Sequence, residues 1–402
     1  MKQVIKTLAA AVTLGSALMA APSMAGGISD DKVRIGVLAD MGGPYGDLCG
    51  RNCVAAVEMA VEDFGGKVLG KKIDVLSADD QNKPDFGSAK AREWLESEGV
   101  DAINGLVASS VVGAVSQVTR SNEKPTLISG AGSNTFTTKT CSPFNAHWSY
   151  DVVALANGTV KPLVDSGKKK WFFITADYSF GHALEKVATG VIESNGGKVV
   201  GAARAPLGTN DYSSFVLQAM SSGADVVALA NAGKDFVNSL KGAVEFGLSE
   251  QATLAGLLVF ASDTKAIDPS IIGNMRLTTG FYWDRDDQSR EWAKRFVDRT
   301  GAVPTMAHAG AYSSTMHYLN AVKEAGTDEG KAVMSKMKEL KPNDFFARNA
   351  TLRSDGRMVH DMYQVRVKTD SERKNDHDLY EIEKVIPGDQ AFGAQLPECD
   401  FK

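Results

Sequence analysis

Short runs of β-branched residues alternate with helical segments along most of this chain, and the whole alternation occurs twice. In the first series the expected strands are residues 33–39, 73–78, 102–104 and 125–129. In the second series, after Cys141, they are residues 171–176, 199–203, 225–230 and 253–259. Such alternation is typical of parallel strands joined by crossover helices. We therefore predict an α/β fold built from two doubly wound, Rossmann-like lobes.

The alternation breaks near residues 279–283, and the pattern of the remaining chain differs. Helices expected at about 288–300 and 307–325 should return to the first lobe. Residues 345–385 suggest antiparallel structure capping the second lobe, with Gly356 as the turn of a hairpin between 350–352 and 358–366. The predicted division is an N-terminal lobe of residues 31–146 plus 284–338, a C-terminal lobe of residues 149–281 plus 342–390, and a tail of residues 391–402.

The first 25 residues have the parts of a secretory signal peptide: basic residues at Lys2 and Lys6, an apolar stretch at 8–21, and small residues before a cleavage site at Ala25. The apolar stretch is too short for a membrane span, and no later stretch approaches the roughly 18 apolar residues that a span requires. No cysteine lies beside the cleavage site to carry a lipid. We expect cleavage after Ala25 and a soluble periplasmic protein.

The four cysteines of the chain are Cys49, Cys53, Cys141 and Cys399. In an oxidising compartment an even number favours disulfides, although four cysteines allow three pairings. We favour Cys49–Cys53, which closes a short loop at a helix start, and Cys141–Cys399, which ties the tail to the middle of the chain. A zinc site would need close CxxC pairs, and the sequence has none.

Charge and motifs argue against several function classes. The formal net charge is −5, with both signs interspersed and no long basic run, so no nucleic-acid partner is expected. No G-x-G-x-x-G follows a predicted strand, and neither a G-x-x-x-x-G-K-[ST] loop nor a G-x-S-x-G elbow occurs. The six histidines are scattered, and His308 and His317 are too far apart for a metal pair on one helical face. We predict no enzymatic activity, no metal and no cofactor.

Several short motifs occur in order along nearly the whole mature chain. They are Ile35-Gly36-Val37-Leu38, Gly42-Gly43-Pro44-Tyr45-Gly46-Asp47, Ala78-Asp79-Asp80-Gln81-Asn82-Lys83-Pro84-Asp85, residues 105–110, Ile128-Ser129-Gly130-Ala131-Gly132-Ser133-Asn134, Asp177-Tyr178-Ser179-Phe180-Gly181, residues 211–215 and Gly247-Leu248. This series resembles the leucine/isoleucine/valine-binding protein family, the type I periplasmic solute-binding proteins of ABC importers. The resemblance implies two lobes joined by three crossing segments that close on a small-molecule ligand. It also implies a monomer whose partner is an ABC permease in the inner membrane.

The loops of the first lobe have the composition of a seat for a carboxylate. Ser109 and Ser110 lie where a strand ends and a helix begins, so N–H groups and hydroxyls there can bind an anion. The small residues of 129–134 let a ligand approach the backbone closely. The same residues would also suit helix caps and a tight turn without a ligand. The resemblance implies that Tyr45, Ser109, Ala131 and Ser133 contact the ligand from this lobe, and we expect the neighbouring Ser110 and Gly132 to contact it as well.

The resemblance places an aromatic ligand contact of the second lobe at Phe180, with Tyr178 beside it. A flat aromatic wall would pack against an apolar or ring-bearing ligand, although a surface Tyr and a core Phe at a helix start would have the same sequence. Trp148 is a further candidate for lining the ligand. Asn231 stands where the family has a Tyr.

Leu257 departs from the family pattern, because amino-acid-binding members place an acidic residue there against the ligand's ammonium. Burying an ammonium against Leu257 without a counter-charge would cost several kcal/mol. The predicted ligand is therefore a small carboxylate with an apolar or aromatic body, of the benzoate or cinnamate type. Asp263 is an alternative position for the acid, so a branched-chain or other amino acid stays open as the ligand. A ligand-sensing subunit for a membrane receptor is the alternative function.

Overall fold

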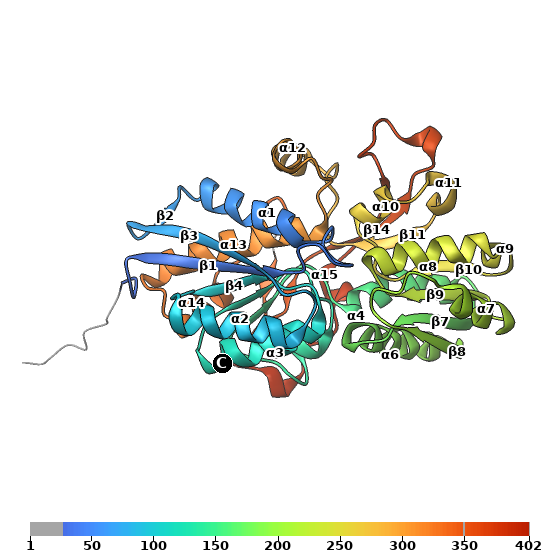
Figure 1. Cartoon of the computed structure of the whole chain (residues 1–402), viewed down its shortest axis with the longest axis horizontal. Coiled ribbons are helices and arrows are strands. Elements are labelled where there is room, and N and C mark those ends of the chain that lie inside the picture. Colours follow the sequence, from blue (N-terminus) through green and yellow to red (C-terminus); the bar gives the residue numbers. More distant parts are fainter. Residues whose placement is uncertain (1–26, 349, 402) are drawn as a thin grey trace, which may run out of the picture.

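The computed structural model describes residues 27–348 and 350–401, and the predicted signal peptide lies outside the described residues. Two α/β lobes lie side by side along the long axis of the molecule (Figure 1). Each lobe has its own largely parallel sheet. The structure thus confirms the predicted fold class.

The first lobe is built on a six-stranded sheet with the order β2-β3-β1-β4-β5-β6, in which only β2 is antiparallel to its neighbour. Its strands are β1 (Lys32–Ala39), β2 (Lys67–Val68), β3 (Lys71–Asp79), β4 (Ala102–Gly105), β5 (Thr126–Ile128) and β6 (Asn145–His147). The helices of this lobe are α1 (Gly50–Asp63), α2 (Pro84–Ser97), α3 (Ser109–Ser121), α12 (Asp287–Thr300), α13 (Met306–Ala325) and α14 (Gly330–Glu339). As the sequence predicted, the chain returns here late, since α12 packs on α1 and α13 packs on α1, β4 and β5.

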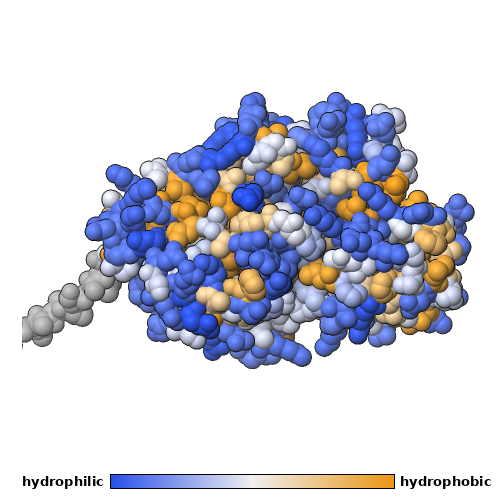
Figure 2. Space-filling model, in the orientation of Figure 1, coloured by the Kyte–Doolittle hydropathy of each residue, from blue (hydrophilic) through white to orange (hydrophobic). Residues whose placement is uncertain are grey.

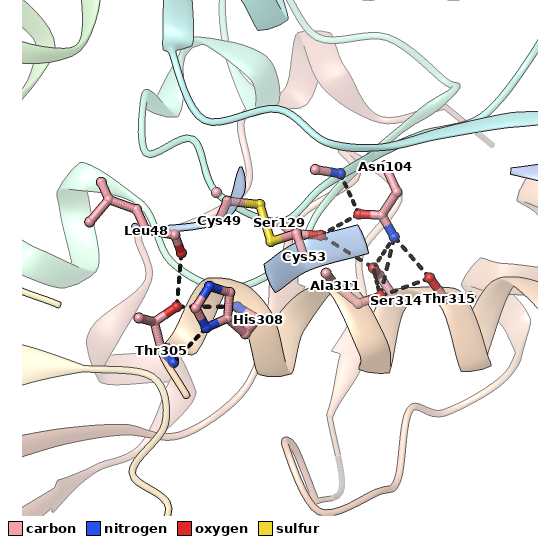
Figure 3. Close-up of a disulfide and its surroundings, with 12 residues drawn as sticks. Leu48, Cys49, Cys53, Asn104, Ser129, Thr305, His308, Ala311, Ser314 and Thr315 are labelled. Carbon is pink, nitrogen blue, oxygen red and sulfur yellow. Dashed lines mark hydrogen bonds between the residues drawn. A yellow bond between two sulfur atoms is a disulfide. The ribbon is translucent and has the colours of Figure 1, made fainter. Parts of the chain in front are cut away.

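A buried amide fixes α13 on this sheet. The Nδ2 of Asn104, on β4, donates to the Ala311 carbonyl at 3.2 Å and to Thr315 Oγ1 at 2.9 Å (Figure 3). Its Oδ1 accepts hydrogen bonds from the Gly105 N–H and from Ser129 Oγ, both at 2.6 Å. Because both ends of the amide are satisfied, the contact specifies one position of the helix on the sheet.

The second lobe combines a parallel sheet of order β10-β9-β7-β8 with an antiparallel sheet of order β11-β14-β15. Its strands are β7 (Lys170–Ala176), β8 (Lys198–Ala205), β9 (Val226–Ala230), β10 (Thr253–Gly256), β11 (Arg276–Thr279), β14 (Met362–Val367) and β15 (Tyr380–Ile386). Its helices are α4 (Val152–Leu155), the π-helical η2 (Ala156–Val160), α5 (Lys161–Asp165), α6 (Ser179–Ser194), α7 (Ser213–Ser221), α8 (Gly233–Glu245), α9 (Leu248–Gln251), α10 (Ala261–Lys265), α11 (Pro269–Ile272) and α15 (Gly388–Ala391). Three short 3-10 turns lie elsewhere, at η1 (Asn134–Thr137), η3 (Asp370–Glu372) and η4 (Pro397–Cys399).

The structure corrects the predicted strands in two places. The strand expected at 253–259 ends at Gly256, and residues 257–260 form a buried loop. The strand expected at 358–366 is divided into β13 (Met358–Val359) and β14. The predicted hairpin does turn at Gly356, between β12 (Thr351–Leu352) and β13, but it lies beside β6 of the first sheet, where the His147 N–H donates to the Gly356 carbonyl at 2.7 Å. Local pattern could not identify this neighbour, because β6 lies far away in the sequence.

Three segments cross between the lobes: residues 148–151, 280–286 and 350–361. Buried Arg357, in the third of these, joins it to the first. It has no exposed surface, and its guanidinium donates to the carbonyls of Trp148 and Tyr150 in the first crossing segment. The Asp151 carboxylate lies 3.7 Å away. Burial lowers the pKa of Arg357 only to about 10, so the side chain stays charged at neutral pH.

The remaining crossing segment packs against the same place. The ring of Phe281, just after β11, lies 6.4 Å from that of Phe346, which in turn lies 5.0 Å from the ring of His360. The Nε2 of His360 lies 2.9 Å from the Ser149 carbonyl oxygen. All three crossing segments therefore meet in one buried cluster, which we call the hinge core.

Both predicted cysteine pairs form disulfides, Cys49–Cys53 and Cys141–Cys399. The second ties the C-terminal tail to the chain just before β6. Hydrophilic residues cover much of the visible face, and hydrophobic residues form scattered patches (Figure 2). Within the described part of the chain, no helix is long and apolar enough to cross a membrane.

The hinge core predicts a large effect of Arg357→Met. The substitution removes every donor to the Trp148 and Tyr150 carbonyls and leaves the buried Asp151 carboxylate without its cation. We expect the free energy of unfolding, measured by urea denaturation, to fall by about 3–5 kcal/mol. The control Arg204→Met, which breaks an exposed pair with Glu185, should cost less than about 1 kcal/mol. Equal losses would contradict a special role for Arg357.

Candidate functional site

The two lobes meet at loops that follow parallel strands, which is where ligands bind in open α/β sheets. Loops after β1 and β5 of the first lobe contact loops after β7 and β9 of the second. Of the residues predicted for the ligand site, Tyr45, Gly132, Tyr178 and Phe180 contact one another there. Ala131 and Ser133 flank Gly132, and Ser109 binds the Ser133 N–H. Leu257 follows β10 and is buried.

Asp40 shapes the loop that carries Tyr45. Its carboxylate, at the end of β1, accepts hydrogen bonds from the backbone N–H groups of Gly43 at 2.6 Å and Tyr45 at 2.9 Å. The Asn82 amide, from the loop after β3, donates to the same carboxylate at 2.5 Å. Asn82 has a φ of 56°, in the left-handed region that Asn tolerates better than most residues. Asn82 of the Asp80-Gln81-Asn82 motif thus helps to hold Asp40, which in turn holds the Tyr45 loop.

A disulfide and a hydroxyl hold the far end of that loop. Cys49, at the start of α1, pairs with Cys53 one turn later. The Leu48 carbonyl accepts a hydrogen bond from Thr305 Oγ1 at 2.9 Å, and Thr305 also begins α13, in a capping box with His308 (Figure 3). Both ends of the loop are therefore fixed before any ligand binds.

The serine hydroxyls of the predicted carboxylate seat form hydrogen bonds within the first lobe. Ser109 opens α3, and its Oγ accepts a hydrogen bond from the Ser133 N–H at 3.3 Å. Ser133 Oγ in turn caps η1 by accepting from the Thr135 N–H. Ala108, at the N-cap of α3, offers no side-chain acceptor to the first N–H groups of this helix, which include those of Ser109 and Ser110. An anion at this point would meet backbone donors at the positive end of a helix.

Ala131 and Gly132, neighbours in the loop after β5, contact different parts of the molecule. The Ala131 carbonyl accepts a hydrogen bond from His147 Nε2 at 2.7 Å, inside the first lobe. Burial lowers the pKa of His147 well below its usual range, so the ring is a neutral donor at pH 7. A Cβ atom at Gly132 would lie 2.7 Å from the ring of Tyr150 and 3.0 Å from that of Phe180. Only glycine therefore fits between the loop and the aromatic residues.

The aromatic wall of the second lobe is formed by Tyr178 and Phe180, whose ring centroids lie 6.1 Å apart. The Tyr178 hydroxyl lies 2.7 Å from the hydroxyl of Tyr45, across the boundary between the lobes. Burial raises the pKa of both phenols, so both are neutral. Tyr150 and Phe260 add an edge-to-face pair with centroids 5.9 Å apart.

The loop at Leu257 is apolar, and the carboxyl of nearby Asp263 is already engaged. Leu257 and Leu258, directly after β10, are buried. Asp263 is only 4% exposed, and its carboxylate accepts from the Phe260 N–H at 3.0 Å and from the Gly233 N–H. Burial raises the pKa of Asp263 to about 7. This side chain fixes the backbone at the starts of two helices.

Trp148 and Asn231, both predicted to contact the ligand, form their hydrogen bonds inside their own lobes. The indole N–H of Trp148 donates to Ser313 Oγ on α13 at 3.0 Å, and its ring lies 5.3 Å from that of His317, so Trp148 packs within the first lobe. The Asn231 amide donates to Ser239 Oγ at 3.0 Å within the second lobe. In the described part of the chain, no group of three His, Cys, Asp or Glu residues is placed to hold a metal ion.

Sequence reasoning missed Asp40, Tyr150 and Gly233. The position of Asp40, directly after a buried strand and before Gly-Gly, was an available signal for a carboxylate that caps a turn. Gly233 offered none, because the atoms it contacts belong to the other lobe.

Comparison with known proteins gives a consistent result. A sequence profile of the family described as periplasmic binding protein matches residues 32–374. A periplasmic binding protein of Burkholderia mallei shares 45% identity and superposes with a TM-score of 0.89, over 91% of this chain and 97% of that chain. A structure described as a branched chain amino acid ABC transporter periplasmic ligand-binding protein, from Burkholderia xenovorans LB400, shares 35% identity with a TM-score of 0.80, over 90% and 97% of the two chains. Leu/Ile/Val-binding protein homolog 6 of Brucella melitensis biotype 1 is 28% identical over 75% of this chain and 79% of its own length.

Asp263 predicts a pH dependence of stability. Its pKa is about 7 in the folded protein and near 3.8 when unfolded, so unfolding between these pH values releases a proton. Its contribution to stability is complete below pH 4 and is lost as the pH rises toward 7, by about 1.4 kcal/mol per pH unit. Asp263→Asn keeps an acceptor for the Phe260 N–H, and in urea titrations from pH 4 to 7 it should make stability fall less steeply, by about 1.4 kcal/mol per pH unit. Asp80 and Asp235, whose pKa values burial raises to about 7 and about 6, keep their own contributions to the slope. The exposed control Asp211→Asn should keep the full slope; an unchanged slope in Asp263→Asn would refute the assignment.

Proposed function

This chain belongs to the periplasmic binding protein family, and we propose from its site that it captures a small carboxylate with an apolar or aromatic body and delivers it to an ABC permease. The observation that carries the proposal is the charge arrangement. The start of α3 has backbone N–H groups without a side-chain cap, and the loop at Gly132 contacts Phe180, beside which lies Tyr178. Neither aromatic side chain carries a charge. The proposal gives the chain no catalytic role.

The hydrogen bonds that Asp263 already accepts argue against a zwitterionic ligand. An ammonium would need an anionic partner, and the Asp263 carboxyl already accepts two backbone hydrogen bonds and is largely protonated below pH 7. A branched-chain amino acid is the alternative ligand, and the description of the Burkholderia xenovorans relative supports it.

In this proposal the chain is exported, cleaved after Ala25, and acts in the periplasm as a monomer. We propose the lobe boundaries predicted from the sequence, with the hairpin at 351–359 assigned to the first lobe because it lies beside the first sheet. The closed form would be read by a permease subunit. Pull-down against permease and receptor subunits separates this role from that of a sensory subunit.

A ligand panel tests the proposal directly. A ligand that binds only the folded protein raises its melting temperature, by an amount that grows with concentration. We expect benzoate- and cinnamate-type acids to raise the melting temperature, and leucine, valine and isoleucine to leave it unchanged. Stabilisation by the amino acids alone would reject the proposed ligand class in favour of the alternative.

Ser109→Ala tests the carboxylate seat. The substitution removes a hydroxyl at the start of α3 and the acceptor for the Ser133 N–H. Hydrogen bonds to a charged group contribute about 1.5–3 kcal/mol, so calorimetric affinity for the best acid of the panel should fall by about tenfold or more. Ser121→Ala, at the opposite end of the same helix, is the matched control and should bind like the parent protein. Equal affinities of all three proteins would place the carboxylate elsewhere.

A further inference from the structure

One short contact joins the backbones of the two lobes directly. The N–H of Lys234, in the first turn of α8, donates to the carbonyl of Pro44 at 3.2 Å. Pro44 belongs to the first-lobe loop that Asp40 holds, and α8 belongs to the second lobe. The hydrogen bond therefore exists only while the lobes are together.

The start of α8 lacks a cap of its own at this position. Its N-cap residue is Ala232, which has no side-chain acceptor for the first N–H groups. Asp263, from the second lobe, accepts from the Gly233 N–H. The next donor, that of Lys234, is satisfied from the other lobe by Pro44. When the lobes are together, the Pro44 carbonyl therefore completes the cap of α8. Its partial negative charge interacts favourably with the positive N-terminal end of the helix.

Gly233 permits this approach because it has no side chain. Its φ is +61°, and a Cβ atom there would lie 2.6 Å from the Pro44 oxygen and 3.1 Å from the ring of Tyr45. A distance of 2.6 Å is too short for any Cβ contact, and the blocking atom belongs to a backbone fixed by Asp40. Any side chain at position 233 must therefore hold the lobes apart.

We propose that Gly233 and Pro44 form an interlobe clasp, assisted by the Tyr45–Tyr178 hydroxyl pair, which sets how far the lobes close and lets them close without a bridging ligand. The clasp uses only protein atoms: one backbone hydrogen bond and one hydroxyl pair at 2.7 Å. It goes beyond the proposed function, because it does not depend on which ligand the site takes. It assigns to Gly233 a positioning role.

Small-angle X-ray scattering of the processed protein, dialysed free of ligand, tests the clasp. The parent protein should contain a compact fraction that fits the closed structure, and Gly233→Ala should lose it and show a larger radius of gyration. The matched control is Gly247→Ala, at the N-cap of α9 in the same lobe, because Gly247 also has a positive φ of +74° but nothing within 4 Å of its Cβ position. It carries the same backbone strain without the clash and should scatter like the parent.

A second variant keeps the test valid if Gly233→Ala folds poorly by circular dichroism. Tyr178→Phe removes only the hydroxyl that meets Tyr45 and should lower the ratio of closed to open molecules by about threefold to tenfold. Identical scattering of the parent, Gly233→Ala and Tyr178→Phe proteins would overturn the clasp, as would an equal change in Gly247→Ala. None of these measurements uses a ligand, so a wrong ligand class would leave their outcome unchanged.

Discussion

A single buried charge, that of Arg357, determines how the two lobes are connected. A guanidinium without exposed surface is tolerable only if its donors and its charge are satisfied, and here two carbonyls of the first crossing segment and Asp151 satisfy them. Because Arg357 itself lies in the third crossing segment, the charge fixes one segment against the other. The aromatic contacts of Phe281 and Phe346 add the second segment. The cluster thus holds all three connections between the lobes together and fixes how the opposing loops are aligned.

Side-chain oxygens of each lobe accept hydrogen bonds from the backbone N–H groups of the loops that meet. Asp40 binds the backbone of the Tyr45 loop, Asp263 binds the N–H groups at the starts of α8 and α10, and Ser109 binds that of Ser133. Because these hydrogen bonds order the loops in advance, ligand binding loses little conformational entropy in the loops. They also explain why the site contains buried carboxyl groups that do not face a ligand.

The sequence predicted what depends on strand order and local chemistry. Ser109, Ser133 and Phe180 each follow a strand closely, so a correct assignment of strands brought them to the same edges of the sheets. The disulfides followed from cysteine number and compartment. The hairpin at Gly356 was placed wrongly because its neighbour, β6, is a short strand far away in the chain. The contact of Gly233 with Pro44 could not be predicted, since it depends on the angle between two lobes, and no local pattern encodes that angle.

The energetics of closing follow from these contacts. Each interlobe hydrogen bond contributes about 0.5–1.5 kcal/mol net, so the clasp alone gives a closed state that is populated but not locked. A ligand shifts this equilibrium only by its stronger binding to the closed form. A carboxylate that accepts from the Ser109 hydroxyl and from the N–H groups at the start of α3 would gain charge-assisted bonds, which are about twice as strong as neutral ones. An ammonium finds no comparable gain, because the Ala131 carbonyl already accepts from His147 and Asp263 already accepts from two N–H groups. The same bonds that hold the loops therefore favour an anion with an uncharged body.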